Sequence, residues 1–277
     1  MNPDSPADIR ALLESRRLAL KKRWGQNFLV NRGARQRLIE ILAPRPTETA
    51  WEIGPGLGSM TELLAAAAAR VVAFEVDRGL CRYLEECLGE LPNFSLVQGD
   101  FLDTWKEAAE AQGTPDRILG NLPYRSASLM IADIIEGGLR PARMVFTVQR
   151  ELADRMTSPP GQKSYSSFSV LCQSCFTVTG RGDLQPGSFY PVPDVVSSIV
   201  EMTPAPGAPE GEELKALSVL ARALFSSRRK TIRNNARDSP FLDALRQEGI
   251  DLGLRAEQVA PEAYVRLARR LTGASSP

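Results

Sequence analysis

The stretch Thr49-Ala50-Trp51-Glu52-Ile53-Gly54-Pro55-Gly56-Leu57-Gly58 decides the fold that this sequence predicts. Its first five residues form a mostly apolar run that is typical of a buried strand. Three glycines at alternate positions then indicate a turn, and helical periodicity begins at Thr61. A strand, a glycine-rich turn and a helix in this order predict the first unit of a parallel α/β sheet.

The same alternation of strand and helix continues along the chain. Further strands are expected at 71–75, 94–98, 118–120 and 144–148, with helices at 61–69 and 78–88. Two more strands, at 176–179 and 197–202, would form a hairpin that completes the sheet. The sequence therefore predicts an α/β protein with a Rossmann-like, seven-stranded, mostly parallel sheet covered by helices on both faces.

A proline-rich segment, residues 203–211, divides the sequence into two predicted domains. The first, residues 1–205, holds the expected sheet and an N-terminal segment that would cover a ligand. The second, residues 206–277, is expected to be a small helical domain, with helical periodicity at 214–225, 241–248 and 261–271.

Composition is that of an ordinary globular protein. The 277 residues are 43% hydrophobic and 24% charged, and they suffice for one large and one small domain. No run of about 18 apolar residues occurs, so no membrane span is expected. The first 14 residues resemble neither a secretory signal nor an acid-poor transit peptide, so a cytoplasmic location is expected.

The chain has four cysteines and no histidine. Cys172 and Cys175 have the spacing of redox or half-zinc motifs, whereas Cys81 and Cys87 are too far apart for a second such pair. Buried free thiols are the simpler interpretation. Because imidazole chemistry is excluded, catalysis must use carboxylates, amides, hydroxyls, lysine or a cofactor, and no metal is expected.

The net charge is only +1, but basic residues are clustered. One cluster is Arg16, Arg17, Lys21, Lys22 and Arg23, and the other is Arg228, Arg229, Lys230 and Arg233. Such clusters are commonly solvated faces. Two of them flanking a domain of balanced charge also indicate a phosphate-rich partner.

Polar residues stand where successive predicted strands end. The spacing of Gly54, Gly56 and Gly58 departs from the G-x-G-x-x-G pattern of dinucleotide sites, which favours S-adenosylmethionine over NAD. Glu75 ends the second strand, where a carboxylate can bind both ribose hydroxyls. Asp100 follows the third strand, where a carboxylate could accept from an adenine amino group. Each acid alone could equally be a surface residue; their succession at strand ends indicates a site.

The fourth strand ends in Asn121-Leu122-Pro123-Tyr124. Pro123 cannot donate to a sheet, so the strand must end there. The Asn121 amide and the Leu122 carbonyl could accept the two N–H bonds of a planar amine, and Tyr124 could stack on its base. The alternative is a proline-terminated strand whose tyrosine fills a gap.

Two further segments are ambiguous. Residues 24–29, Trp-Gly-Gln-Asn-Phe-Leu, are either an amphipathic entry turn before a helix at 34–42 or a lid whose amides meet a polar ligand. Residues 188–195 form a proline-stiffened loop in which Phe189 and Tyr190 are expected at the surface. That loop is either a rigid connector or a wall that sandwiches a flipped base against Tyr124.

Taken together, these segments resemble the ribosomal RNA adenine dimethyltransferases, and most closely the type that acts on small-subunit rRNA. The resemblance covers nearly the whole chain in order, through residues 26–29, 52–58, 75, 100, 121–124, 189–195 and 228–234. It implies S-adenosylmethionine as methyl donor and dimethylation of the N6 amine of two adjacent adenosines near the rRNA 3′ end. It further implies an immature small ribosomal subunit as partner, and we expect a monomer.

The resemblance also implies roles for single residues. The cofactor contacts of the family fall on Asn27, Leu29, Gly54, Glu75, Asp100 and Asn121. Its target-base residues fall on Asn121, Tyr124 and Phe189, and the Leu122 carbonyl is expected to help Asn121 hold the amine. Two departures concern RNA contacts: the family commonly has lysine where Asp194 stands, and Gly-x-Leu where residues 166–168 are Ser-Ser-Phe.

The implied mechanism is direct in-line transfer to an extruded base, without metal or covalent enzyme intermediate. Three other classes of protein compete with it. A methyltransferase acting on large-subunit rRNA is disfavoured by the long helical tail and the near-neutral isoelectric point. A binding protein without catalysis is disfavoured by the intact residues 121–124, and a NAD-dependent dehydrogenase by the glycine spacing.

Overall fold

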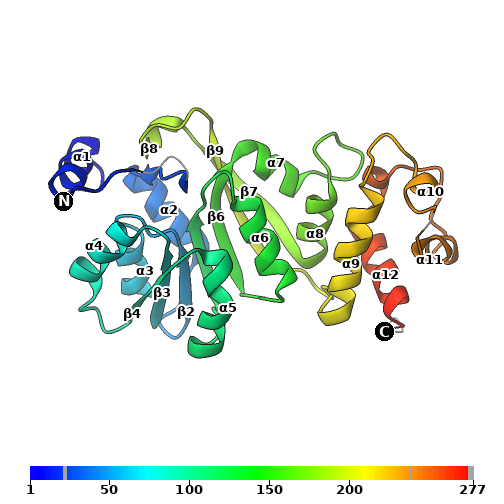
Figure 1. Ribbon diagram of the computed structural model, residues 1–277, viewed down its shortest axis with the longest axis horizontal. Coiled ribbons are helices and arrows are strands. Elements are labelled where there is room, and N and C mark those ends of the chain that lie inside the picture. The colour runs from blue at the N-terminus through cyan, green and yellow to red at the C-terminus, as the bar shows by residue number, and fades with distance from the viewer. Residues whose placement is uncertain (21–23, 238, 274–277) are drawn as a thin grey trace. The chain divides into compact units, whose positions relative to one another are not determined.

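The computed structural model describes residues 1–20, 24–237 and 239–273 (Figure 1). The chain forms two units. The sheet unit comprises Met1–Met130, Pro141–Arg150 and Gly180–Met202, and the helical unit comprises Ile131–Arg140, Glu151–Thr179 and Thr203–Pro277. Two internal segments that the sequence assigned to the first domain thus group with the C-terminal helices.

The sheet has seven strands in the order β4-β3-β2-β5-β6-β9-β7. Neighbouring strands from β4 to β6 pair in parallel, and β9 pairs with β6 in the antiparallel sense. This confirms the predicted α/β class with its mostly parallel sheet, and places the two expected C-terminal strands side by side. The strands are β2 (Thr49–Ile53), β3 (Arg70–Glu75), β4 (Phe94–Gln98), β5 (Arg117–Asn121), β6 (Arg143–Gln149), β7 (Phe176–Leu184) and β9 (Ser197–Pro204).

Helices cover the two faces of the sheet, as strand β2 illustrates. Ala50 faces an apolar cluster that includes Leu38 and Leu64, which come from helices on that side. Trp51 faces the other way and begins a chain of ring contacts through Phe74 to Phe101, with centroids 4.9 and 5.1 Å apart. The helices of this part of the chain are α2 (Arg32–Leu42), α3 (Thr61–Ala67), α4 (Arg78–Leu88), α5 (Phe101–Gln112) and α6 (Ala127–Glu136).

The N-terminal segment adds elements outside the main sheet. Helix α1 (Pro6–Ser15) begins at Ser5, whose side chain accepts from the Asp8 amide, with a proline in the first turn. Strand β1 (Phe28–Leu29) pairs antiparallel with β8 (Phe189–Tyr190), which is 160 residues away along the sequence by the Leu29–Phe189 register. The sequence did not predict this pairing.

The helical unit is built around three aromatic residues. The ring of Phe225 lies 6.1 Å from that of Tyr165 and 6.4 Å from that of Tyr264. Both tyrosines are buried, and their hydroxyls donate to the Val259 and Ala256 carbonyls at 3.1 and 3.0 Å. The unit contains α7 (Arg150–Thr157), α8 (Ser167–Cys175), α9 (Gly211–Leu224), α10 (Ile232–Asn235), α11 (Phe241–Gln247) and α12 (Pro261–Thr272). None of the described helices is long and apolar enough to cross a membrane.

The parallel register brings the carboxyl ends of the central strands to one edge. Ile53 pairs with both Phe74 and Gly120, and Glu75 pairs with Gln98. Gly54 continues the ladder by donating to the Phe74 carbonyl at 3.0 Å. The glycine turn, Glu75 and the end of β5 therefore lie at the same edge, where open α/β sheets bind ligands.

A buried ion pair fixes the opposite edge. Arg117 donates from Nε and Nη2 to the two carboxylate oxygens of Glu48 at 2.8 and 3.0 Å, and the side chains are only 7% and 13% exposed. We expect Glu48→Ala to lower the free energy of unfolding by about 3 kcal/mol, because the guanidinium stays buried without its counter-charge. Urea denaturation of the variant measures this loss.

Glu212→Ala is the matched control, because the Glu212–Lys215 pair is exposed on both sides. Its loss should stay below about 1 kcal/mol. A loss at Glu48 no larger than that of the control would contradict the expected contribution of the buried pair.

Candidate cofactor pocket and active site

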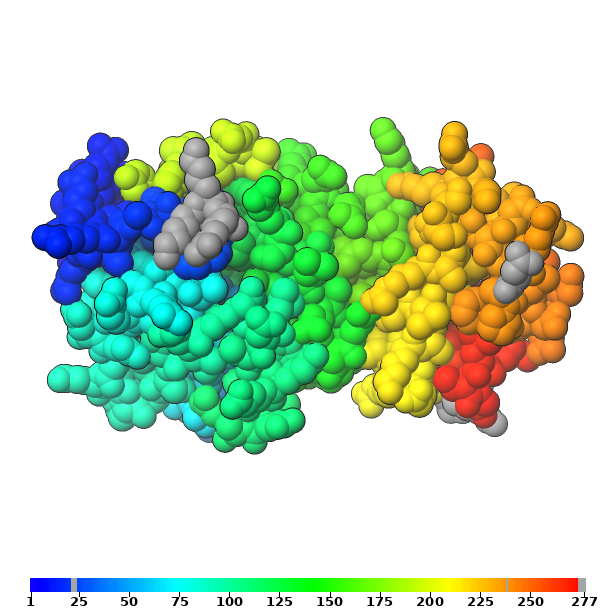
Figure 2. All heavy atoms as spheres, in the orientation of Figure 1, coloured from blue at the N-terminus to red at the C-terminus, as the bar shows by residue number. Residues whose placement is uncertain are grey.

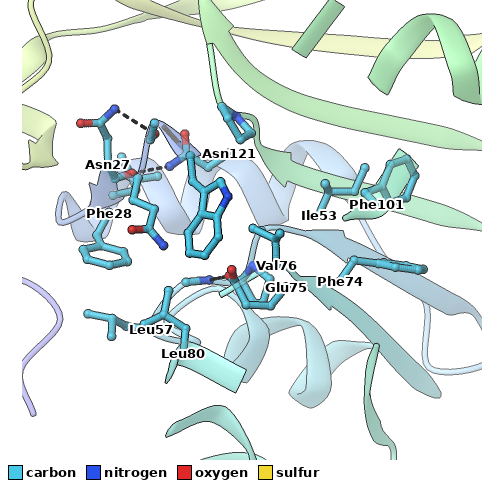
Figure 3. Close-up of a pocket in the computed structure, with 18 of the residues that line it drawn as sticks. Asn27, Phe28, Ile53, Leu57, Phe74, Glu75, Val76, Leu80, Phe101 and Asn121 are labelled. Carbon is cyan, nitrogen blue, oxygen red and sulfur yellow. Dashed lines mark hydrogen bonds between the residues drawn. The ribbon is translucent and has the colours of Figure 1, made fainter. Parts of the chain in front are cut away.

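A pocket of about 260 Å³ opens at the carboxyl edge of the sheet (Figure 3). Its walls come from the N-terminal segment, the glycine turn, and the ends of β3, β4 and β5. All six residues that the resemblance assigns to the cofactor line it, namely Asn27, Leu29, Gly54, Glu75, Asp100 and Asn121. The structure thus brings together side chains that are up to 94 positions apart in the sequence.

The glycine turn is shaped by close approach of other side chains. Gly56 has a φ of +59°, and a Cβ there would lie 2.9 Å from the ring of Phe28. Gly58 has a φ of +80°, and its Cβ would lie 3.0 Å from both Leu84 and Leu88. Both positions therefore require glycine for conformation and for space. The turn lets the backbone itself form one wall of the pocket.

Glu75 is held at the end of β3, under the turn. Its Oε2 accepts from the Gly56 amide at 3.3 Å (Figure 3). Its Oε1 accepts from the Asp77 amide at 2.9 Å. Burial raises the pKa of Glu75 to about 7, although these two amides oppose the shift. Donors from a ligand would favour the charged carboxylate further.

Asn121 joins β5 to the N-terminal segment. Its Nδ2 donates to the Asn27 backbone carbonyl at 2.7 Å, and the side-chain Nδ2 of Asn27 donates to the Gly25 carbonyl at 3.2 Å (Figure 3). In the part of the chain that the structure describes, no donor is bonded to the Oδ1 of Asn121. The amide is thus oriented by its nitrogen, and its oxygen is left for an incoming N–H group.

Leu122 and Tyr124 stand beside the pocket and do not line it. The Leu122 amide donates to the Thr147 carbonyl at 3.0 Å, which fixes this backbone to β6, and its side chain is buried. The Tyr124 hydroxyl lies 2.6 Å from the Ser197 hydroxyl. Burial raises the pKa of the half-buried phenol, and the Ser197 contact opposes the shift. The ring is therefore anchored at its far end.

The expectation that Phe189 is exposed was wrong. Its side chain is 1% exposed and belongs to the apolar cluster that includes Leu29 and Leu38. The pairing of β8 with β1 turns the ring inward, where burial of its apolar surface is favourable. Phe189 therefore does not face a base against Tyr124. Tyr190 is half-buried and accepts from Arg10 at 3.3 Å, so the exposed residues of this loop are Val192, Asp194 and Val195.

Asp100 and Leu29 occupy different walls of the pocket. Asp100 is exposed and begins α5, with Oδ1 accepting from the Leu102 amide at 3.0 Å. Its second oxygen faces no protein donor among the described residues. Leu29 is buried, and its carbonyl accepts from Arg35 at 2.7 Å.

The sequence offered no role for α1, yet Ile9 of this helix lines the pocket together with Pro3. Arg35, which is buried, holds the segment in place through an ion pair with Asp4. The spacing of Ile9 and Leu13 was the available signal, because two apolar residues four apart predict a buried helix face.

Glu52 is a buried acid that faces away from the pocket lining. Its side chain is 0% exposed, and neither carboxylate oxygen has a hydrogen-bond partner among the described residues. Burial raises the pKa of Glu52 to about 7. Repulsion from Glu75 raises the pKa of Glu52 further, whereas the neighbouring Thr61 hydroxyl lowers it. The Thr61 hydroxyl does not reach hydrogen-bond geometry.

The cysteines show no sign of a metal or redox site. Cys172 and Cys175 are buried free thiols, and burial raises the pKa of both, that of Cys175 to about 11. Such thiols are poor nucleophiles and ligands. Over the described ranges, no group of three or more Cys, Asp or Glu residues could hold a metal ion.

The pocket and its position define a class of protein. A glycine turn, a strand-end carboxylate and an oriented amide at the carboxyl edge of an open α/β sheet are the site of a Rossmann-like methyltransferase. The model of the family described as ribosomal RNA adenine dimethylase matches residues 17–273. The chain belongs to this family, which confirms the predicted enzyme class, an S-adenosylmethionine-dependent rRNA adenine dimethyltransferase.

Individual relatives agree with this assignment. The ribosomal RNA small subunit methyltransferase A of Borreliella afzelii is 38% identical over 275 residues, which cover 98% of this chain and 96% of that protein. The protein of the same name from Treponema pallidum is 39% identical over 280 residues, covering 98% and 97%.

Two solved structures share the fold. A dimethyladenosine transferase from Plasmodium falciparum superposes with a TM-score of 0.75 at 22% identity, covering 88% of this chain and 97% of that one. The 23S rRNA methyltransferase ErmE superposes with a TM-score of 0.66 at 26% identity, covering 89% and 100%.

The buried acid Glu52 generates a prediction about stability. Its pKa is raised from 4.5 to about 7 in the folded protein, so folding becomes less favourable as pH rises through this window. We expect Glu52→Gln to raise the free energy of unfolding by roughly 1–3 kcal/mol at pH 8, and by little at pH 4.5, where the folded protein already holds the proton. Urea denaturation at the two pH values measures the difference.

The control is Glu62→Gln, which removes an exposed acid in the first turn of α3. Its effect should be small and independent of pH. A gain at Glu52 that is the same at both pH values would contradict burial of charge as its cause.

Proposed function

We propose that this protein transfers two methyl groups from S-adenosylmethionine to the N6 amine of each of two adjacent adenosines in the 3′-terminal hairpin of small-subunit rRNA. The substrate particle is the immature small ribosomal subunit. The observation that carries the chemistry is the oriented amide of Asn121, with Nδ2 engaged and Oδ1 open at the rim of the pocket. The choice of small-subunit RNA rests on relatives of that name at 38% and 39% identity, against 26% for the 23S enzyme.

The residues of the pocket fit this cofactor. The glycine turn forms one wall of the pocket, and Glu75 offers a buried carboxylate that two ribose hydroxyls would keep charged. Asp100 can accept from the adenine amino group, with Leu29 as an apolar wall. When bound, S-adenosylmethionine supplies an electrophilic methyl group on a sulfonium.

The protein's share of the reaction is to hold the amine. The Oδ1 of Asn121 and the Leu122 carbonyl accept the N–H bonds of the amine, two before the first transfer and one before the second, which pulls the nitrogen lone pair out of conjugation with the ring. After each transfer the alkylated amine loses one proton to solvent water. Tyr124, anchored through Ser197, stacks on the extruded base. The roles are positioning and hydrogen bonding, and proximity supplies most of the acceleration. Phe189 acts on the site only by packing beneath β1.

The RNA-binding surfaces are also part of the proposal. In the helical unit, Arg228 pairs with Glu257 at 3.3 Å, whereas Arg229, Lys230 and Arg233 are exposed and form no ion pair with a described residue. These cations can meet phosphates. Residues 206–277 are the proposed ribosome-binding domain. Of the N-terminal basic cluster, Lys21, Lys22 and Arg23 lie outside the described residues.

A metal-free monomer in the cytoplasm completes the proposal. Neither binding of the target amine nor methyl transfer requires a Lewis acid, because a methyl group on a sulfonium is already electrophilic. Loss of activity in a chelator, with recovery on adding metal, would contradict the metal-free part.

In the decisive assay, the protein is incubated with labelled S-adenosylmethionine and, in separate reactions, with immature small subunits or with bare large-subunit RNA. We expect dimethyladenosine in the small-subunit reaction alone, at two adjacent positions near the rRNA 3′ end, measured by nuclease digestion and mass spectrometry. Product on large-subunit RNA alone would assign the chain to the other substrate. Cofactor binding without product on either RNA would indicate a binding protein.

Asn121→Ala tests whether Asn121 holds the target amine by hydrogen bonding. We expect transfer to fall at least ~100-fold, because the variant lacks an interaction made with the reacting amine, while the Kd for S-adenosylmethionine changes by no more than a few-fold. Single-turnover methylation and calorimetric titration measure the two quantities.

Ser126→Ala is the control for Asn121→Ala. Ser126 lines the same pocket, and the one hydrogen bond that its side chain makes with a described residue is to the Met130 sulfur, at 3.9 Å. Its transfer rate should stay within a few-fold of the parent. Near-normal turnover in Asn121→Ala would remove the assigned role.

A further inference from the structure

A second hollow, of about 410 Å³, lies beside the cofactor pocket in the sheet unit. Trp24 and Val76 line both cavities, so the two are adjacent. Three arginines line the hollow, namely Arg17, Arg78 and Arg82. We propose that this basic hollow binds a backbone phosphate of the substrate RNA next to the target adenosine, an inference that rests on the proposed function.

The three arginines carry unneutralised charge. All three are exposed, and none forms an ion pair with any described residue. By contrast, the neighbouring Arg16 pairs with Glu86. The acid that lines the hollow is Asp77, whose Oδ1 caps α4 by accepting from the Gly79 amide at 2.7 Å. One carboxylate against three guanidinium groups leaves the hollow strongly positive.

Packing brings these arginines together from two separate segments. Arg78 and Arg82 are four apart on α4, so they share one face of the helix. Arg17 follows α1 and has a φ of +53°, a conformation that costs energy for a residue other than glycine. The turn is closed by the Leu18 amide, which donates to the Leu13 carbonyl at 2.8 Å.

The segment that follows α1 packs closely against the start of α4. A Cβ on Gly79 would lie 2.4 Å from Leu18, so the Leu18 side chain rests directly on the backbone of the first turn of α4. Ile9 and Leu13 of α1 pack in one apolar cluster with Leu80 and Tyr83 of α4. Figures 1 and 2 show α1, in dark blue, beside the cyan α4. Arg17 is thus fixed beside the Arg78 and Arg82 face.

The chemistry of the hollow matches a phosphodiester. Guanidinium groups bind phosphate oxygens through paired N–H donors and keep their charge at any physiological pH. The hollow lies at the start of α4, where the helix dipole also favours an anion. Trp24 of the hollow is followed by Gly25, which lies against the Tyr124 segment: a Cβ on Gly25 would be 3.6 Å from Pro123 and 3.9 Å from the Tyr124 nitrogen. An RNA strand whose extruded base stacks on Tyr124 must therefore carry its flanking phosphates close to the hollow. The hollow can therefore set the strand position relative to the methyl donor.

The test is the double variant Arg78→Gln/Arg82→Gln in the full-length protein. We expect the KM for immature small subunits to rise ~10-fold or more, with kcat and the Kd for S-adenosylmethionine within a few-fold of the parent. The dependence of log(1/KM) on log salt concentration should become shallower by about 0.7–0.9 for each phosphate that the variant no longer neutralises. Arg17→Gln should give a smaller change in the same direction.

The matched control is Arg45→Gln, which removes an exposed arginine before β2, at the opposite edge of the parallel sheet. Its KM and salt slope should equal those of the parent. Melting temperatures check that every variant is folded. The charge-reversal variant Arg82→Glu repeats the measurement of KM and salt slope at a single position.

An unchanged KM and salt slope in the double variant would overturn the inference. So would a fall in S-adenosylmethionine affinity without a change in KM, which would assign the arginines to the cofactor. If the parent itself does not methylate small subunits, the proposed function fails instead. In that case the inference about the hollow is tested by direct binding of small subunits at several salt concentrations. A salt dependence in the double variant equal to that of the parent would overturn it.

Discussion

The parallel register of β2 with β3 and β5 is the constraint on which the site depends. It sets Gly54, Glu75 and Asn121 at one edge, although each comes from a different βα unit. The ladder continues past the strand ends, because the Gly54 amide donates to Phe74 and the Gly99 amide to Glu75. A slip of one residue would turn Glu75 to the other face of its strand, away from the pocket.

The N-terminal segment completes what the sheet begins. Strand β1 is only two residues long, so its position depends on the β8 pairing, on the bond from Asn121 to Asn27, and on Arg35. The same bond that orients the Asn121 amide therefore also fastens one wall of the pocket. The position of this wall and the orientation of the Asn121 amide are therefore coupled through one hydrogen bond.

Local patterns predicted most of the fold and pointed to the glycine turn, Glu75, Asp100 and Asn121, whereas Asn27 and Leu29 were assigned only by the family resemblance. The strands, the glycine turn and the polar strand ends are visible in the sequence because each follows from a short run of residues with one periodicity. The inward orientation of Phe189 was not visible, since it depends on pairing with Leu29 far along the chain. The contribution of Ile9 to the pocket, and the grouping of residues 151–179 with the C-terminal helices, are likewise tertiary features that local periodicity does not specify.

Two buried acids show that this edge of the sheet is arranged for a ligand more than for stability. Glu52 and Glu75 repel one another, and burial raises the pKa of each to about 7. A protein selected for stability alone would replace such a pair with apolar or amide side chains. Glu75 lines the pocket, whereas Glu52 does not. Hydrogen-bond donors or positive charge on a bound ligand would favour the charged form of Glu75. The cost of burying its carboxylate would therefore be offset by a ligand of that kind, and S-adenosylmethionine carries both ribose hydroxyls and a sulfonium charge.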